Sequence, residues 1–148
     1  MRVIVTCGPS YEPIDRVRRL TNFSTGELGL MLAAELSRAG HEVTCLRGEG
    51  AVSHVDAGGA EVIPFSTNDD LLRRLQAIAE PEKTGAVFHT AALCDYRVTG
   101  ADGAEIVRAK LPSRAGALTL TLEPATKLLP RLRGVFPAAR IVGWKYEL

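Results

Sequence analysis

The first 48 residues alternate a strand, a helix and a second strand, and this order restricts the fold more than any other feature. Residues 2–7 are a short β-branched apolar run, as expected of a strand buried on both faces. Residues 26–39 follow a helical pattern, and residues 42–46 form the next predicted strand. The apolar stripe of the helix consists of Leu28, Leu32, Leu36 and Ala39. A strand, a helix and a strand in this order indicate a parallel pair with a right-handed crossover.

The same alternation continues to the end of the chain. Further strands are predicted at residues 61–64, 86–90, 118–122 and 139–143. A second helix is expected around residues 71–78, capped by Thr67, Asn68 or Asp69, and a short one has Leu128, Leu129 and Leu132 inward. Residues 48–59 are predicted to be a loop and residues 97–109 a mobile loop. The sequence therefore predicts an α/β, Rossmann-like three-layer αβα fold with a mostly parallel sheet.

Length and charge exclude several classes of protein. A chain of 148 residues fits one domain. Its 18 Lys and Arg against 17 Asp and Glu give a net charge of +1, which offers no global field for nucleic acid or an anionic membrane. No apolar run approaches the roughly 20 residues of a membrane span. The three cysteines, Cys7, Cys45 and Cys94, have no metal-ligand spacing, and we expect buried, reduced thiols in a cytoplasmic protein.

The segment between the first strand and the first helix is one candidate site. It matches neither GxGxxG nor the phosphate loop of NTPases. Ser24 and Glu27 have capping-box spacing, which predicts a helix start near Ser24 or Thr25. Backbone N–H groups at that start could hold a phosphate, and Gly26 and Gly29 would let a ligand approach closely. The alternative is a plain capped helix packed tightly on the sheet.

Two further segments have polar side chains that could bind a ligand near predicted strand ends. Ala91 and Ala92 leave room for a ligand, and Asp95 could accept a hydrogen bond from a ribose or a base, or simply cap a turn. Lys110 could close on a phosphate, or belong to a solvated basic loop. The three histidines have no partner spacing for zinc or for a Ser-His-Asp site. Three arginines that could bind an anion are predicted to be solvated charges on a helix face, namely Arg16, Arg18 and Arg19.

Five short motifs occur in the order in which one known family carries them. They are Glu12-Pro13-Ile14-Asp15-Arg16-Val17-Arg18, Asn22-Phe23-Ser24-Thr25-Gly26-Glu27-Leu28-Gly29, Ala92-Leu93-Cys94-Asp95-Tyr96, Lys110-Leu111-Pro112-Ser113 and Gly143-Trp144-Lys145. With these motifs the sequence resembles the phosphopantothenate–cysteine ligase family (phosphopantothenoylcysteine synthetase), the ligase part of the DNA/pantothenate metabolism flavoproteins. The lysine motif is similar to that of the family's free-standing members.

The resemblance implies a cytoplasmic ligase that joins 4′-phosphopantothenate to cysteine in coenzyme A biosynthesis. CTP or ATP would be the co-substrate, accompanied by Mg²⁺. The carboxylate would attack the α-phosphate and release pyrophosphate, and the cysteine amine would then displace the nucleotide from the acyl intermediate. This chemistry requires no nucleophile from the protein. The resemblance also implies a homodimer and a separate flavin-dependent decarboxylase as a partner, whereas nucleic acid and membranes are not expected as partners.

The five motifs indicate which residues of this sequence correspond to functional positions of the family. Two residues would be catalytic: Asn22 would hold the acyl-nucleotide, and Lys110 would neutralise the triphosphate. The residues expected to bind the nucleotide are Asp95, Lys110, Thr126, Lys127, Leu128, Trp144 and Lys145. The residues expected to bind phosphopantothenate or its phosphate are Gly8, Ser10, Asn22, Ser24, Thr25, Gly26, Ala91 and Ala92. We expect no metal ligand among the side chains.

Two departures from the family keep other functions open. Pro9-Ser10 stands where the family has Gly-Thr, which removes one backbone donor. Family members also continue for several dozen residues beyond the Gly-Trp-Lys motif, so we expect the ligase-like domain over residues 1–148 to lack a C-terminal segment. The main alternative is a non-catalytic nucleotide- or phosphate-binding module of the same fold. An NAD(P)-dependent reductase is a further alternative, which the lack of GxGxxG and of a Tyr-x-x-x-Lys pair disfavours.

Overall fold

Five parallel strands form the central sheet of the computed structural model, which describes residues 1–101, 104–105 (backbone only), 110–111 and 116–145. The strands are β1 (Arg2–Cys7), β4 (Glu42–Gly48), β5 (Glu61–Phe65), β6 (Thr84–His89) and β10 (Arg140–Gly143). Their order across the sheet is β10-β6-β1-β4-β5, and each pairing is parallel. The strand order thus reverses between β1 and β6, and in open α/β sheets ligands bind outside the carboxyl ends of the strands at such a point.

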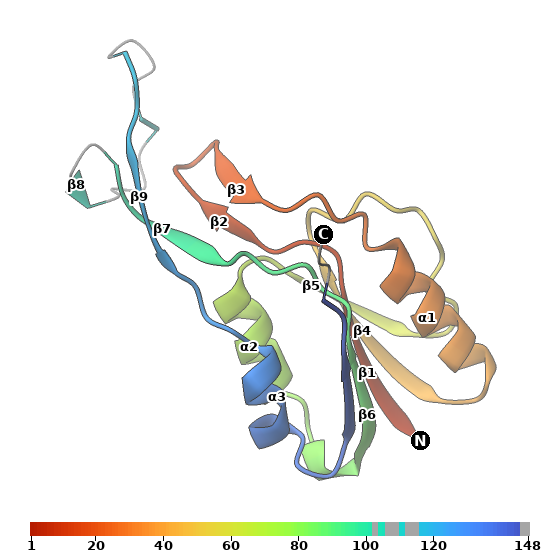
Figure 1. Ribbon diagram of the computed structural model, residues 1–148. Coiled ribbons are helices and arrows are strands. Elements are labelled where there is room, and N and C mark those ends of the chain that lie inside the picture. The colour runs from red at the N-terminus through yellow and green to blue at the C-terminus, as the bar shows by residue number, and fades with distance from the viewer. Residues whose placement is uncertain (102–103, 106–109, 112–115, 146–148) are drawn as a thin grey trace.

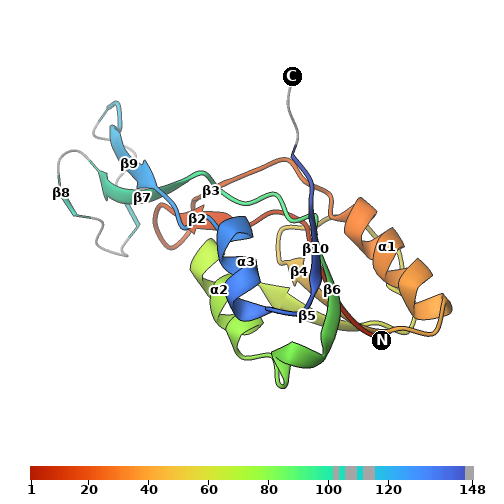
Figure 2. The ribbon, with the colours of Figure 1, turned by 60° about the horizontal axis from the view of Figure 1, so that its bottom comes forward.

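Helices cover both faces of this sheet (Figures 1 and 2). The helix α1 (Glu27–Arg38) packs on one face, and α2 (Asn68–Gln76) and α3 (Leu129–Val135) pack on the other. The core under α1 includes Val3, Val5, Cys7, Leu30, Ala33, Val43 and Cys45. The core under α2 and α3 includes Ile4, Leu46, Phe65, Leu71, Leu75, Val87, Leu128, Leu132 and Phe136. The predicted three-layer αβα fold is confirmed.

Strand β1 shows why its sequence is an unbroken apolar run. Successive side chains of a strand point to opposite faces, so Val3 and Val5 pack under α1 while Ile4 packs under α2 and α3. All three side chains are fully buried. A strand in the middle of a parallel sheet therefore needs apolar residues at both odd and even positions, which is the pattern of residues 2–7.

Helix α1 begins later, and buries a different face, than the sequence indicates. Gly26 occupies its N-cap position with φ 80°, where the capping-box prediction placed Ser24 or Thr25. Leu28 is 53% exposed, and the residues buried against the sheet are Gly29, Leu30, Ala33 and Ala34. The predicted stripe was therefore wrong for Leu28 and Ala39, which are exposed, whereas Leu36 packs against the core under α1 as predicted. The small residues on the buried face let the helix lie close to β1.

Two antiparallel elements include segments predicted as loops, although the strand predicted at residues 118–122 is confirmed in part by β9. A hairpin of β2 (Tyr11–Pro13) and β3 (Arg19–Thr21) follows β1. An arm of β7 (Tyr96–Ala101), β8 (Ala104–Glu105) and β9 (Leu120–Pro124) projects beyond the sheet (Figure 1). The mobile loop predicted at 97–109 was therefore wrong for the part that forms β7 and β8, and its remaining residues lie outside the described ranges. Tyr, Val and Thr in β7 have high strand propensity, a signal that the nearby glycines obscured.

The other helices and the cysteines follow the predictions more closely. Thr67 caps α2, since its hydroxyl accepts a hydrogen bond from the Asp70 N–H at 3.1 Å. In α3 the proline stands in the first turn and Leu132 is buried, but Leu129 is 45% exposed rather than inward. A short 3-10 helix (Pro81–Lys83) precedes β6. All three cysteines are buried free thiols, namely Cys7, Cys45 and Cys94.

Among the residues that the structure describes, no helix combines the length and the apolar character needed to cross a membrane.

Candidate functional site

A cavity of about 340 Å³ lies at the carboxyl ends of β6 and β10, beside the first turn of α3. It is therefore next to the point where the strand order reverses. Twelve residues line it: His89, Ala91, Leu93, Cys94, Asp95, Thr126, Lys127, Leu128, Leu129, Pro130, Trp144 and Lys145. The mixture of apolar walls with a few charged groups is typical of a small-molecule site.

The charged edge of the cavity is built by the two segments that enter and leave the arm. Strands β7 and β9 pair antiparallel, with Tyr96 opposite Pro124. The pairing continues one residue further, where the Ala125 N–H donates to the Asp95 carbonyl oxygen at 2.9 Å. This brings the side chains of Asp95 and Lys127 together in an exposed ion pair. Two residues that are 32 positions apart in the sequence thus meet because a hairpin connects them.

The end of β10 contributes the aromatic side of the cavity. The Trp144 N–H donates to the carbonyl oxygen of His89 at 3.4 Å, which extends the pairing of β10 with β6. The indole is 48% exposed, and its ring centroid lies 6.3 Å from that of Phe88. Lys145 follows directly and also lines the cavity. An exposed indole beside cations offers a flat surface on which a base can stack and charges that attract phosphate.

His89 is a site residue that sequence reasoning missed. Register places it beside Thr6 on the neighbouring strand, and its Nδ1 lies 2.7 Å from the Thr6 hydroxyl. The residue is 6% exposed and lines the cavity. Burial lowers the pKa of His89 to about 4, so its ring is neutral at pH 7. The only signal in the sequence was a histidine at the last position of a predicted buried strand. Such a histidine has no fixed spacing to a partner residue, so it forms no recognisable motif.

This buried histidine predicts a pH dependence of stability. The unfolded chain takes up a proton near pH 6.5 and the folded chain only near pH 4, so the free energy of unfolding should fall as the pH drops between these values. The expected loss is about 3 kcal/mol. Urea unfolding at several pH values should show a flatter profile for His89→Leu. The exposed His54→Leu is the control, and an unchanged slope in His89→Leu would contradict the prediction.

The predicted phosphate-binding residues after β1 also make contacts within the protein, and their role stays a prediction. Gly8 and Gly26 both have positive φ, and a Cβ at either would lie within 3 Å of the Ala51 Cβ. Ser10 is fully buried, and its hydroxyl donates to Asn68. Thr25 is exposed, and its Oγ1 accepts a hydrogen bond from the backbone N–H after Gly26. Ser24 is half-buried beside it.

Asn22 lies at the rim of the cavity. Its Nδ2 donates to the carbonyl oxygen of Leu93, which lines the cavity, at 2.9 Å. The side chain is exposed, so its second N–H remains directed at the surface. Ala91 lines the cavity too, and Ala92 is bridged to Pro9 in the loop after β1. The segment after β1 and the segment after β6 therefore meet at one place.

Lys110 is not among the described residues that line the cavity. Its neighbour Leu111 is held at the hairpin turn, where its N–H donates to Asp15 at 3.0 Å and its carbonyl oxygen accepts from Arg18 at 2.8 Å. The Arg18 guanidinium holds the pKa of the Asp15 carboxyl well below its usual range. Arg18 is thus part of a built ion pair, not a solvated helix-face charge as predicted. The rest of the lysine motif, including Pro112, Ser113 and Arg114, lies outside the described residues.

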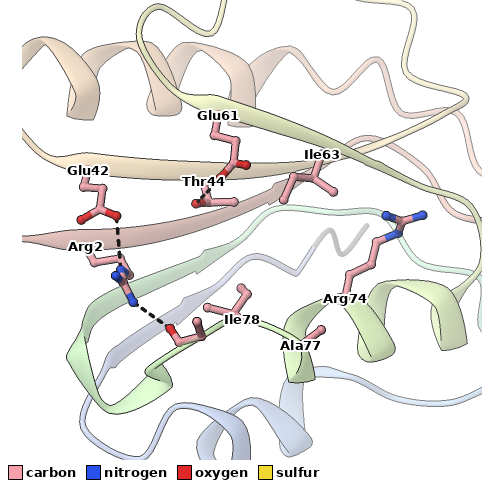
Figure 3. A pocket seen from close by; sticks show the side chains of 9 residues that line it. Arg2, Glu42, Thr44, Glu61, Ile63, Arg74, Ala77 and Ile78 are labelled. Carbon is pink, nitrogen blue, oxygen red and sulfur yellow. Dashed lines mark hydrogen bonds and ion pairs between the residues drawn. The ribbon is translucent and has the colours of Figure 1, made fainter.

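A second cavity, of about 370 Å³, lies at the opposite ends of the strands (Figure 3). Its polar groups bond one another. Arg2 donates to the Ala79 carbonyl oxygen at 2.7 Å and lies 3.4 Å from Glu42, and Thr44 donates to Glu61 at 3.3 Å. Of the described residues that the sequence predicted for a site, none lines this cavity. The carboxyl-end cavity is therefore the candidate site.

Comparison with known proteins identifies the family. Residues 1–147 match the model of the DNA/pantothenate metabolism flavoprotein C-terminal domain. The chain belongs to this family. The coenzyme A biosynthesis bifunctional protein CoaBC of Thermococcus kodakarensis is 32% identical over 147 residues, and the same-named protein of Bacillus subtilis is 30% identical over 145. These matches cover 99% and 98% of this chain, which spans about a third (34%) of either relative.

Solved structures of related domains have the same fold as this flavoprotein C-terminal domain. The DNA/pantothenate metabolism flavoprotein from Streptococcus pneumoniae superposes with a TM-score of 0.79 at 24% identity, covering 95% of this chain and 67% of that one. The C-terminal domain of a coenzyme A biosynthesis bifunctional protein CoaBC superposes with a TM-score of 0.70 at 25% identity, covering 95% and 61%. The family resemblance drawn from the motifs is confirmed by the family model and by the sequence relatives.

In this flavoprotein C-terminal domain, most of the positions predicted to bind a nucleotide gather at one cavity. Six of the seven line it, namely Asp95, Thr126, Lys127, Leu128, Trp144 and Lys145. They come from three separate segments, which the family resemblance grouped and which the fold brings to one cavity. Lys110 is the exception, and its role stays a prediction.

Proposed function

We propose that this domain ligates 4′-phosphopantothenate to cysteine in coenzyme A biosynthesis, with CTP or ATP as co-substrate and an acyl-nucleotide as intermediate. The observation that carries the proposal is the gathering of six expected nucleotide-binding residues around the carboxyl-end cavity. The names of the two relatives, coenzyme A biosynthesis bifunctional proteins, support the same pathway. Because this chain spans a third of those relatives, their complete activities are not carried over.

The cavity suits a nucleoside triphosphate in size and chemistry. Its volume of about 340 Å³ lies within the usual range of small-molecule pockets. We assign the base to the exposed face of Trp144 and the ribose to the carboxylate of Asp95. Lys127 and Lys145 supply positive charge for the phosphates. Leu128, which is buried beneath them, forms an apolar wall.

In the proposed first step, a carboxylate oxygen of phosphopantothenate bonds to the α-phosphorus of the nucleotide. The bond between that phosphorus and the bridging oxygen breaks, and pyrophosphate leaves with the electron pair. The protein must hold the two anions in line and offset their charge. The lysines at the cavity would do this, and Lys110 would join them from its anchored loop. No protein nucleophile takes part.

In the proposed second step, the cysteine amine bonds to the acyl carbon and the nucleoside monophosphate leaves. The amine loses a proton, and an amide results. Negative charge develops on the acyl oxygen before the leaving group departs. Asn22 can donate to that oxygen with the N–H that does not bond to Leu93, because a side-chain amide carries two protons.

Mg²⁺ would arrive with the triphosphate. In the part of the chain that the structure describes, no three His, Cys, Asp or Glu side chains gather in a way that could hold a metal ion. The donor set at the cavity fits a metal carried by phosphate oxygens and waters, which is how Mg²⁺ commonly binds. It would neutralise phosphate charge there. By the same family resemblance we propose that the protein is a cytoplasmic homodimer and that a separate flavin-dependent decarboxylase is its partner.

The test measures the products of both proposed steps with the same protein. With phosphopantothenate and Mg²⁺, CTP or ATP should yield pyrophosphate, and added cysteine should yield the amide and the nucleoside monophosphate. Nucleotide binding without pyrophosphate release would favour the non-catalytic binding module. NADPH binding in place of CTP and ATP binding would favour the reductase alternative. Either result would remove the ligase proposal.

A further inference from the structure

Asn68 is a buried amide that lies beneath the candidate site without lining it. It is the first residue of α2 and is 2% exposed. The sequence marked it only as one of three possible helix caps, and Thr67 takes that role. An amide side chain this deeply buried must satisfy its donors and acceptor within the protein, because an unpaired polar group is costly there.

Its hydrogen bonds reach three loops. Nδ2 donates to the carbonyl oxygen of Cys94 at 2.8 Å and to that of Thr126 at 3.0 Å. Oδ1 accepts from the Ser10 hydroxyl at 2.7 Å. The Ser10 oxygen in turn accepts from the Cys94 N–H at 2.8 Å. Both amide protons are therefore used, and the orientation of the amide is fixed because each nitrogen contact is a carbonyl and the oxygen contact is a hydroxyl.

The two carbonyl groups that Asn68 joins have a specific place in the site. Cys94 directly precedes Asp95, and Thr126 directly precedes Lys127. Asp95 and Lys127 are the ion pair at the charged edge of the cavity. Two carbonyl oxygens repel each other unless a donor lies between them, and the Asn68 amino group is that donor. Removing it would let the two segments separate at the position where the charged side chains emerge.

We propose that Asn68 is a positioning residue of the carboxyl-end cavity, which fixes the spacing of Asp95 and Lys127 for nucleotide phosphate and ribose. The inference rests on the proposed function, because it assigns Asn68 a part in that site. A positioning role differs from a purely stabilising contact in the property that a mutation should change, namely the nucleotide affinity. Loss of the amide should weaken nucleotide binding through Lys127 more than it destabilises the fold.

The test compares Asn68→Ala and Asn68→Ser with Thr67→Ala. The control removes the cap of the same helix, which should lower stability by a similar amount while leaving both carbonyl bonds intact. Mg²⁺-CTP and Mg²⁺-ATP are titrated by calorimetry at a temperature where every variant is folded. We expect the dissociation constant to rise about tenfold in the Asn68 variants and to stay near the wild-type value in the control.

A double-mutant cycle with Lys127→Met separates positioning from general destabilisation. If Asn68 acts through Lys127, Asn68→Ala should have little further effect on binding in the Lys127→Met background. Hydrogen exchange of the Ala125 amide, which bonds across the two segments, reports their docking without any nucleotide. It should be faster in Asn68→Ala than in Thr67→Ala.

Additive effects in the cycle, or wild-type nucleotide affinity in folded Asn68→Ala, would overturn the inference while leaving the proposed function standing. A wild-type chain that binds neither CTP nor ATP would instead overturn the proposed function, and the role of Asn68 in nucleotide binding with it. Exchange at Ala125 would then still show whether the amide docks the two segments.

Discussion

Replacing Asn22 by aspartate should slow cysteine-dependent amide formation by about 100-fold or more, the usual cost of losing a donor to a developing oxyanion. Aspartate has no proton to donate, and its charge would lie against the Leu93 carbonyl oxygen that now accepts from Nδ2 at 2.9 Å. Pyrophosphate release should fall much less, because the first step does not depend on this donor. The acyl-nucleotide should therefore accumulate, and mass spectrometry of quenched reactions would detect it.

Asn22→Ala separates the loss of the donor from the added charge. It should also impair the second step, although its effect on binding the anionic intermediate should be smaller than that of aspartate. Unfolding curves for both variants check that the exposed position leaves the fold intact. Unchanged amide formation with cysteine in Asn22→Asp would remove Asn22 from the mechanism.

Gly29→Ala should destabilise the fold by about 3 kcal/mol or more. A Cβ atom at this position would lie 2.2 Å from the Cys7 Cβ and 2.7 Å from the Thr90 hydroxyl oxygen. Both neighbours belong to the carboxyl ends of the central strands, so α1 would have to move away from the sheet. The gain in helix propensity, about 1 kcal/mol, is too small to offset this overlap. Urea unfolding measures the difference.

Gly134→Ala in α3 is the matched control. A Cβ there meets open space among the described residues, so only the propensity gain remains. This variant should be unchanged or slightly more stable than wild type. If Gly29→Ala were as stable as Gly134→Ala, the close packing of α1 on β1 would be contradicted, and the glycine would be free for the ligand approach that the sequence first indicated.

The sequence was informative where one physical requirement dominates. The run from Val3 to Val5 has to be buried on both faces, and a hydroxyl at Thr67 has an evident use ahead of a helix. The strand-end location of Asp95 and Trp144 also follows from the alternation of strands and helices. These features depend on residues that are close together in the sequence, so they can be predicted from one sequence.

The errors occurred where distant segments decide the local structure. Ser24 has capping-box spacing, but Gly26 occupies the N-cap position of α1 with a positive φ, and a Cβ there would lie 2.9 Å from the Cβ of Ala51, in a loop 25 residues away. Leu28 fits an apolar stripe, yet the face of the helix that is buried against the sheet consists of Leu30 and small residues. Nothing in the sequence distinguishes Asn68 or His89 from other polar residues. Only the fold places Asn68 against two carbonyl groups and His89 at the cavity.

The fluorescence of Trp144 reports whether a nucleotide binds at the carboxyl-end cavity. This is the single tryptophan of the chain, and it lines the cavity. Titration with Mg²⁺-CTP or Mg²⁺-ATP should change its emission saturably, with a midpoint between about 1 μM and 1 mM. Lys127→Met should raise that midpoint by about tenfold. Emission that stays unchanged with both nucleotides up to about 10 mM, well above that range, would show that the cavity binds neither of them.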